Sequence, residues 1–293
     1  MRKRAICPGS MGELVQGLRE GREVLISLPI DRYSEMELIW GEEERERKKN
    51  TLWKSEKALQ IALREWGVEH LAEQITFRRL RKIPEGKGLA SSTADIAALL
   101  GALARLLGKP VREEEIARIA LQVEPTDGVF FPELSIFDHL EGRIKLSLPL
   151  PRYLGVVVVE LPGERETLAV NREKLRENWL RHRREVEEAF RLVERGLEEG
   201  DLSLIGRGAT LSGQIMQEVE KEDLWEKVVS LSREMGASGV NRAHTGKAFG
   251  ILFDRRVYTP REMLSRVREA LKKEEVKIEV NAVISGGVRV VEL

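Results

Sequence analysis

The chain has 293 residues, and its 49 lysines and arginines balance its 49 aspartates and glutamates, so the formal net charge at neutral pH is zero. This balance excludes a whole-chain basic field of the kind that holds nucleic acid or an anionic membrane surface. Hydrophobic residues make up 42% of the chain and charged residues 33%, a composition that predicts a buried core under an ionic surface. The length is typical of about two domains.

Cysteine content and apolar patterning narrow the class of protein further. The chain has one cysteine, Cys7, which excludes an internal disulfide and a cysteine-based zinc cluster. No apolar segment of signal-peptide length follows the basic start, and no run approaches the roughly eighteen apolar residues of a membrane span. We therefore expect a cytoplasmic protein in a reducing compartment, with neither a membrane nor a nucleic acid as partner.

In the first 83 residues, the sequence predicts two strands, then one helix, then a third strand. Residues 24–30 and 34–40 are predicted as two strands with a turn at 29–32. The almost wholly charged segment 42–50 is predicted as a solvated loop, with an exposed lid edge as the alternative. Apolar residues recur at helical spacing in 55–66, and residues 74–83 read as a strand that leads into Pro84.

A glycine loop then joins this strand to a buried helix that continues to residue 107. Backbone N–H groups at a helix start have no partners within the helix, and the peptide dipoles favour an anion there. Gly86, Gly88 and the small Ala90 let the backbone approach a phosphate closely. The Walker A pattern does not occur in the chain, so a phosphate site here would be of another kind.

An ordinary helix start is the alternative interpretation of the same residues. Ser92 as N-cap, with Asp95 three residues later, would make a capping box that needs no ligand. A carboxylate in the first turn would also weaken the field that an anion uses. The glycines alone support the phosphate site and the ordinary helix start about equally.

The remainder of the chain predicts an α+β fold. Helices are expected at 112–124, 171–199, 201–216, 223–235 and 260–273, and strands at 135–137, 143–148, 155–160, 249–253, 276–283 and 288–290. Pro149 and Pro151 bracket a linker, so we place a domain boundary there, between 1–150 and 151–293. The alternation indicates helices packed on one face of a sheet.

Two carboxylates stand where the helix at 112–124 ends. Glu124 is followed by Pro125, Thr126, Asp127 and Gly128. Taken alone, this pattern is more typical of a helix end followed by a tight turn than of a catalytic site.

The glycine loop as a whole resembles the second motif of the GHMP kinases, the superfamily of galactokinase, homoserine kinase, mevalonate kinase and phosphomevalonate kinase. That motif is proline, three residues, Gly-Leu, a small residue, Ser-Ser and a small residue. The matching residues are Pro84, Gly88, Leu89, Ala90, Ser91, Ser92 and Ala94. The resemblance implies a two-domain α+β fold, with an ATP-binding lobe like ribosomal protein S5 domain 2 at 1–150 and a ferredoxin-like lobe at 151–293.

Both ends of the chain resemble the same superfamily. Pro8, Gly9 and Ser10, followed by Gly12 and Glu13, are similar to its opening motif, although Ser10 stands where many members carry lysine. The glycine-spaced segment 236–250 occupies the place of its C-terminal motif. Both segments look like the form found in the branch that phosphorylates L-threonine in cobalamin biosynthesis.

The resemblance assigns roles to particular residues. Asp127 would orient and deprotonate the acceptor hydroxyl as the catalytic base, and Glu124 with Ser92 or Ser91 would hold Mg²⁺. The expected ATP-phosphate residues are Pro84, Gly86, Lys87, Gly88, Leu89, Ala90, Ser91, Ser92, Thr93 and Ala94. The expected substrate residues are Ser10, Glu13, Arg242, His244, Thr245 and Gly246, whereas His70, His139 and His182 are interpreted as structural.

The activity that the resemblance implies is ATP- and Mg²⁺-dependent phosphorylation of L-threonine, which gives O-phospho-L-threonine and ADP for cobalamin biosynthesis. The alternatives are the same chemistry on homoserine or another small alcohol, and a non-catalytic binding or regulatory protein with this fold. Glu124, Asp127, Ser91 and Ser92 together argue against the non-catalytic alternative. The oligomeric state is left open, a homodimer included.

Overall fold

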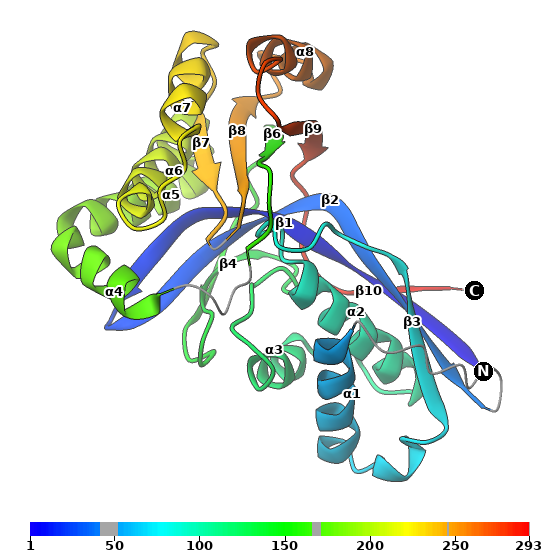
Figure 1. Cartoon of the computed structure of the whole chain (residues 1–293). Coiled ribbons are helices and arrows are strands. Elements are labelled where there is room, and N and C mark those ends of the chain that lie inside the picture. Colours follow the sequence, from blue (N-terminus) through cyan, green and yellow to red (C-terminus); the bar gives the residue numbers. More distant parts are fainter. Residues whose placement is uncertain (42–51, 166–170, 245, 293) are drawn as a thin grey trace.

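The computed structural model describes residues 1–41, 52–165, 171–244 and 246–292 (Figure 1). The strands are β1 (Arg2–Arg19), β2 (Arg22–Trp40), β3 (Ile75–Arg81), β4 (Leu134–Asp138), β5 (Lys145–Leu148), β6 (Leu154–Glu160), β7 (Gly239–Arg242), β8 (Ala248–Asp254), β9 (Lys277–Ala282) and β10 (Arg289–Val291). The helices are α1 (Trp53–Glu65), α2 (Ser91–Leu106), α3 (Glu113–Leu121), α4 (Arg172–Arg181), α5 (Arg183–Glu199), α6 (Leu202–Gln217), α7 (Trp225–Glu234) and α8 (Pro260–Ala270), with a 3-10 turn at Glu69–Leu71. The loop expected at 42–50 lies outside the described residues.

The described strands form one ten-stranded sheet with the order β5-β4-β2-β1-β7-β8-β6-β9, while β3 pairs with β2 and β10 with β1. Every strand pairing within it is antiparallel. Antiparallel strands with helices outside the sheet confirm the predicted α+β class. The division into lobes at about residue 150 stays a prediction, because the sheet is continuous across it.

The hairpin of β1 and β2 is the longest feature of the sheet. Glu20 and Gly21 form its turn with φ of 52° and 75°, the left-handed pair that suits a two-residue hairpin. The prediction of two strands within 24–40 was wrong, because β2 runs through Pro29 without a break. The pairing with β1 is irregular in this region: two extra residues of β2, 31 and 32, lie opposite the Pro8/Gly9 step, and one extra residue of β1 lies between Ser10 and Glu13.

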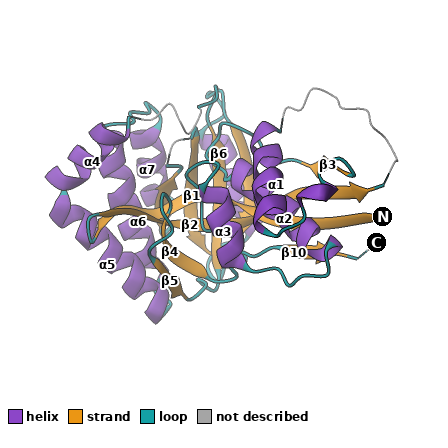
Figure 2. Ribbon diagram, turned by 90° about the horizontal axis from the view of Figure 1, so that it is seen from below, coloured by secondary structure: helices purple, strands orange, loops and turns teal. Residues whose placement is uncertain are grey.

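Apart from α8, which packs against β6 and β9, the helices form two groups toward the two ends of this hairpin (Figures 1 and 2). One group is α1 to α3, of which α2 packs against β1 and β2. The other is α4 to α7, of which α6 packs against β1 and β7. Within the described residues, none of these helices is long and apolar enough to cross a membrane.

The single long helix expected at 171–199 is two helices, and this prediction was wrong. The chain turns at His182, where φ is −99° and ψ is 31°. Each half buries its own apolar face: α4 buries Leu175 and Trp179, and α5 buries Val186 and Phe190. The charged, helix-favouring sequence around the break carries no signal for the turn, so tertiary packing decides it.

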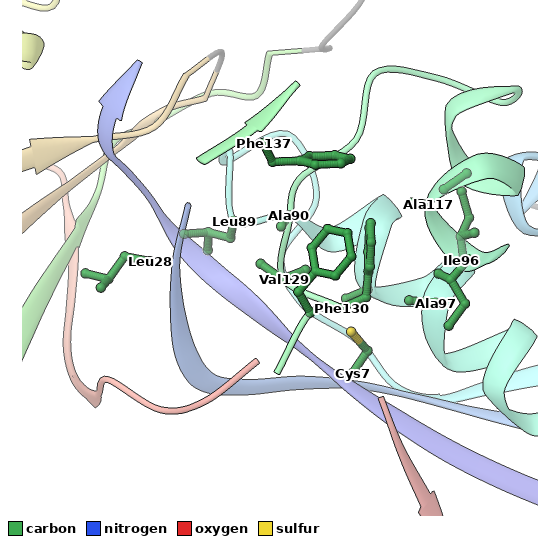
Figure 3. Packing of buried hydrophobic residues seen from close by; sticks show 14 of the residues in the cluster. Cys7, Leu28, Leu89, Ala90, Ile96, Ala97, Ala117, Val129, Phe130 and Phe137 are labelled. Carbon is green, nitrogen blue, oxygen red and sulfur yellow. The ribbon is translucent and has the colours of Figure 1, made fainter. Parts of the chain in front are cut away.

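The larger apolar core joins the two helix groups through the sheet. It includes nearly all of the apolar residues of α2, together with Cys7 of β1 and the aromatic residues Phe130 and Phe137. Figure 3 shows part of this cluster, to which Leu89 and Ala90 of the glycine loop also belong. The loop is therefore fixed to the core at the point where α2 begins.

A backbone contact holds α6 against β7. A Cβ atom added to Gly206 of α6 would meet the backbone carbonyl of Ser238, and one added to Gly239 would meet the carbonyl of Gly206. The Val240 N–H also donates to Thr210 Oγ1 at 2.9 Å. Only a residue without a side chain allows this approach of helix and strand.

Gly206→Ala is therefore expected to lower the free energy of unfolding by about 1–3 kcal/mol, as overpacking does. This effect opposes the gain of about 1 kcal/mol that alanine gives in a helix. Urea denaturation followed by circular dichroism measures it. The control is Arg207→Ala on the exposed face of the same helix, for which we expect a change within about 0.5 kcal/mol. Unchanged stability in Gly206→Ala would contradict a constraint from this contact.

Candidate active site

A cavity of about 560 Å³ lies where the start of α1, the glycine loop, the start of α2 and the turn after α3 meet the β1–β2 hairpin. Its wall includes Glu124, Asp127 and the loop residues from Gly88 to Thr93. The residues expected to act as base and to bind the metal, and most of those expected to bind phosphate, thus come together around one space. Glu13 and His244, predicted from the two ends of the chain, line the same cavity.

The glycine loop reaches α2 through alternating left-handed residues. Gly86, Gly88 and Ala90 have φ of 67°, 71° and 57°. Such alternation turns successive N–H groups toward one side, which suits an anion. The non-glycine Ala90 is strained in this conformation, and strained residues of this kind concentrate at functional sites.

The capping box that the alternative interpretation required is absent. The N-cap of α2 is Ala90, which has no side-chain cap hydrogen bond. Asp95 instead accepts hydrogen bonds from Ser34 Oγ and, at 2.7 Å, from Arg79 Nη1. The buried Asp95 side chain therefore pairs with residues of β2 and β3 rather than with the first turn of its own helix. The N–H groups at the start of α2 therefore remain available to a ligand.

Segments from both ends of the chain support the loop through backbone contacts. The Ser10 N–H donates to the Leu89 carbonyl at 3.1 Å. A Cβ atom on Gly88 would lie 2.9 Å from the Cα atom of Gly246. The first and last motifs therefore act here through their backbones, which explains their small residues.

Asp127 is held by hydroxyl groups. Ser27 Oγ donates to Asp127 Oδ1 at 3.1 Å, and the Asp127 N–H donates to Thr93 Oγ1 at 3.2 Å. Burial raises the pKa of the Asp127 carboxyl, although the bond from Ser27 and the nearby His139 oppose this rise. A carboxylate with a raised pKa that faces a cavity is suited to accept a proton.

Glu13 lies beside Asp127 and is 4% exposed. Its Oε2 atom is buried without a hydrogen-bond partner among the described residues. Burial, reinforced by the charge of Asp127, raises the pKa of Glu13 well above its ordinary value. A cationic group of a ligand would satisfy this pair of carboxylates.

Lys54, in the first turn of α1, is a site residue that the sequence did not reveal. Its Nζ atom lies 2.6 Å from Glu124 Oε2 and donates to Ser92 Oγ at 3.2 Å. Burial raises the pKa of Glu124, and the Lys54 ammonium opposes this rise. The only sequence signal was a lysine at the start of a helix, which is usually a solvated residue.

Two histidines close the other end of the cavity. The rings of His139 and His244 have centroids 5.1 Å apart, and both residues line the cavity. Burial lowers the pKa of His244 well below its ordinary value, and Gln16 Oε1 contacts its Nδ1 atom. His139, which was expected to be structural, thus also lies in the cavity wall. Its proximity to His244 depends on the pairing of β4 with β2.

Some residues predicted for binding lie outside the cavity wall. Those among the described residues are Ser10, Pro84, Lys87, Ala94, Arg242 and Gly246. The Lys87 Nζ atom donates to the carbonyls of Leu161, at 2.7 Å, and Gly163, at 2.5 Å, so it ties the loop to the segment after β6. Thr245 lies outside the described residues.

Arg242 is buried away from the cavity and has a structural place. Its guanidinium donates to Gln217 Oε1 and to the Glu220 carbonyl, both at 2.9 Å. Burial lowers its pKa to about 10. The expectation that Arg242 faces the acceptor is therefore corrected: β7 turns the side chain toward the end of α6.

The oxygen atoms near Glu124 fit a magnesium ion that also binds phosphate. Glu124 Oε1 is buried without a hydrogen-bond partner among the described residues, and the hydroxyl-bearing residues Ser91 and Ser92 line the same wall. Carboxylate and hydroxyl oxygens are the hard ligands that Mg²⁺ prefers. No group of three histidine, cysteine, aspartate or glutamate residues in the described chain could hold a metal. One carboxylate and one or two hydroxyl groups leave coordination positions open, so this set suits a metal that also binds the phosphates of a nucleotide.

Comparison with known proteins agrees with this geometry. Residues 50–131 match the family described as GHMP kinases N terminal domain. The chain is 29% identical to an L-threonine kinase of Salmonella typhimurium over 97% of its own length and 94% of the relative's. It is 31% identical to an L-threonine kinase of Citrobacter freundii over 86% of each chain.

A solved structure shares the whole fold. The homoserine kinase of Cytophaga hutchinsonii superposes with a TM-score of 0.72 at 16% identity, covering 99% of this chain and 97% of that one. The expected fold is therefore confirmed over the full chain. Together with the site, these similarities show that the chain belongs to the GHMP kinases and is a phosphotransferase with an alcohol group as acceptor.

Proposed function

We propose that this protein transfers the γ-phosphoryl group of ATP to the side-chain hydroxyl of L-threonine, giving O-phospho-L-threonine and ADP. The observation that carries the proposal is the single cavity in which the uncapped start of α2, Glu124 and Asp127 meet. Phosphoryl transfer needs little covalent chemistry from the protein beyond positioning and charge neutralisation. This cavity offers both.

The two ends of the cavity would have different roles, one in binding the nucleotide and the metal and the other in accepting the proton. The backbone from Gly86 to Ser92 would hold the ATP phosphates, and Glu124 with Ser92 or Ser91 would hold Mg²⁺. The metal, when bound, supplies positive charge that neutralises the phosphates. The hydroxyl oxygen of the acceptor would form a bond to the γ-phosphorus while the bond from that phosphorus to the ADP oxygen breaks. Asp127 would accept the proton that the hydroxyl group loses.

L-threonine is the acceptor that the relatives and the cavity favour together. Both curated relatives are named L-threonine kinase, at 29% and 31% identity over most of the chain. The buried pair Glu13 and Asp127 offers negative charge to an amino group, which sugars and mevalonate lack. We place the product in cobalamin biosynthesis, as the resemblance of the first and last motifs implies.

Homoserine is the second candidate acceptor. It carries the same amino and carboxylate groups, with the hydroxyl on a primary carbon, and a homoserine kinase shares the fold over the whole chain. The sequence identity to that protein is 16%, about half of the identity to the L-threonine kinases. L-threonine is therefore the first choice.

The acceptor test is ADP release with ATP and Mg²⁺ in the presence of L-threonine, L-serine, homoserine, mevalonate, galactose or no acceptor. We expect selective stimulation by L-threonine and loss of turnover in excess chelator. Stimulation by another alcohol would retain the mechanism and change the substrate. Full activity in excess chelator would contradict the metal site.

Asp127→Asn is expected to retain ATP binding and to lower turnover by at least about a hundredfold, because an amide cannot accept the proton. In the unmodified protein, activity should fall as the pH drops through the Asp127 pKa, which burial raises above its ordinary value of about 4. Residual activity of the variant should lack that acidic limb. A kcat near that of the unmodified protein would remove Asp127 from the mechanism.

Gly88→Val is expected to weaken ATP binding by about tenfold or more, measured by calorimetry, because the side chain would strain the loop against Gly246. Gly67→Val is the matched control. Gly67 has a φ of 70°, close to the 71° of Gly88, but a Cβ atom added to it would have no neighbouring atom within 4 Å. If both folded variants bound ATP equally well, the loop would not be the phosphate site.

A further inference from the structure

The Lys54 ammonium lies between the two side chains that the proposed function gives to the metal. It contacts Glu124 Oε2 at 2.6 Å and Ser92 Oγ at 3.2 Å. The Glu124 side chain is 3% exposed and the Lys54 side chain 26% exposed, so the pair is largely shielded from water. A buried carboxylate needs such a cation, because its charge is otherwise uncompensated.

An ammonium and a magnesium ion cannot both occupy this position. The two cations would repel each other at close range, because both would bind the Glu124 carboxylate, the lysine through Oε2 and the metal through the unpartnered Oε1, and both would use the Ser92 hydroxyl. Lysine has a flexible stem with a compact charge and three donors, so it can move to a new acceptor without loss of hydrogen bonding. Phosphate oxygens held at the start of α2 would be such acceptors, because Lys54 lines the same cavity.

The other strong cations of the described cavity wall are already paired outside the metal position. Arg79 binds Asp95 and Glu85, each at 2.7 Å, and Arg165 binds Glu220. Ser10 of the first motif carries no charge and lies outside the cavity wall. Lys54 is therefore the ammonium best placed to reach the transferred phosphate.

We propose that Lys54 is an exchange cation that neutralises Glu124 in the free protein and binds the nucleotide phosphates when the metal-bound nucleotide takes over Glu124 and Ser92. The inference rests on the proposed function, since it requires the nucleotide and metal positions given above. It has a direct consequence. The free protein should bind a divalent metal poorly, and metal and nucleotide should enter together.

The test measures Mn²⁺ binding to the free protein by electron paramagnetic resonance, at about pH 8 where carboxylates are ionised. Lys54→Met should bind Mn²⁺ at least about tenfold more tightly than the unmodified protein, because its Glu124 carboxylate is uncompensated. The matched control is Lys57→Met, which removes an exposed lysine from the same helix and should change nothing. Damage to the fold would weaken Mn²⁺ binding rather than strengthen it.

The second measurement is the affinity for ATP with Mg²⁺, by calorimetry. Lys54→Met should weaken it by about tenfold or more, since a charge-assisted hydrogen bond to phosphate is lost. Lys54→Gln keeps a donor for Glu124 without the charge, and it should show both effects even if the methionine variant is unstable. Opposite changes in the two affinities distinguish an exchange cation from a structural residue.

Two results would overturn the inference. If the unmodified protein and the Lys54 variants bound Mn²⁺ equally well, or if the variants kept full affinity for ATP with Mg²⁺, Lys54 would not exchange. With either result, normal ATP binding and L-threonine turnover by the unmodified protein would still support the proposed function. If the unmodified protein bound no ATP, the proposed function and this inference would fail together.

Discussion

The close approach of three backbone segments at the glycine loop is the constraint on which the site depends. Gly88 leaves no room for a side chain against Gly246, and Ser10 binds the Leu89 carbonyl through its N–H. These contacts fix the loop from both ends of the chain, at the point where α2 begins without a side-chain cap on its first N–H groups. The long β1–β2 hairpin and the sheet that it organises serve to bring these segments to one place.

Buried charge is the second organising feature of the site. Glu13, Asp127 and Glu124 place three carboxyl groups along one cavity, and burial raises the pKa of each. Such a concentration of acid is costly unless cations or protons compensate it. Lys54 compensates Glu124, whereas the second oxygen of Glu13 has no partner among the described groups. The site therefore favours ligands that bring positive charge, such as a metal ion and an amino group.

Most elements with a clear local signal were predictable within a few residues. The helix after the glycine loop is a long apolar run that follows a glycine-rich segment, whereas α6 and α8 begin at side-chain N-caps, Asp201 and Thr259. The errors fell where local signals were weak. The segment that begins at Pro29 was predicted as a turn but belongs to β2. The sequence around His182 was predicted as continuous helix, but α4 ends there. The expected boundary at about residue 150 stays a prediction.

The sequence by itself determined the order of the motifs, because a glycine loop, a serine pair and a helix-ending Glu124 act over short stretches of chain. Only the tertiary structure decided which side chains complete the site. Lys54 meets Glu124 across 70 residues of sequence, and His139 reaches His244 because strands pair across the sheet. Arg242 likewise points away from the cavity because its guanidinium bonds to Gln217 and Glu220, which are distant in sequence. Contacts between distant segments depend on packing, and no local pattern records them.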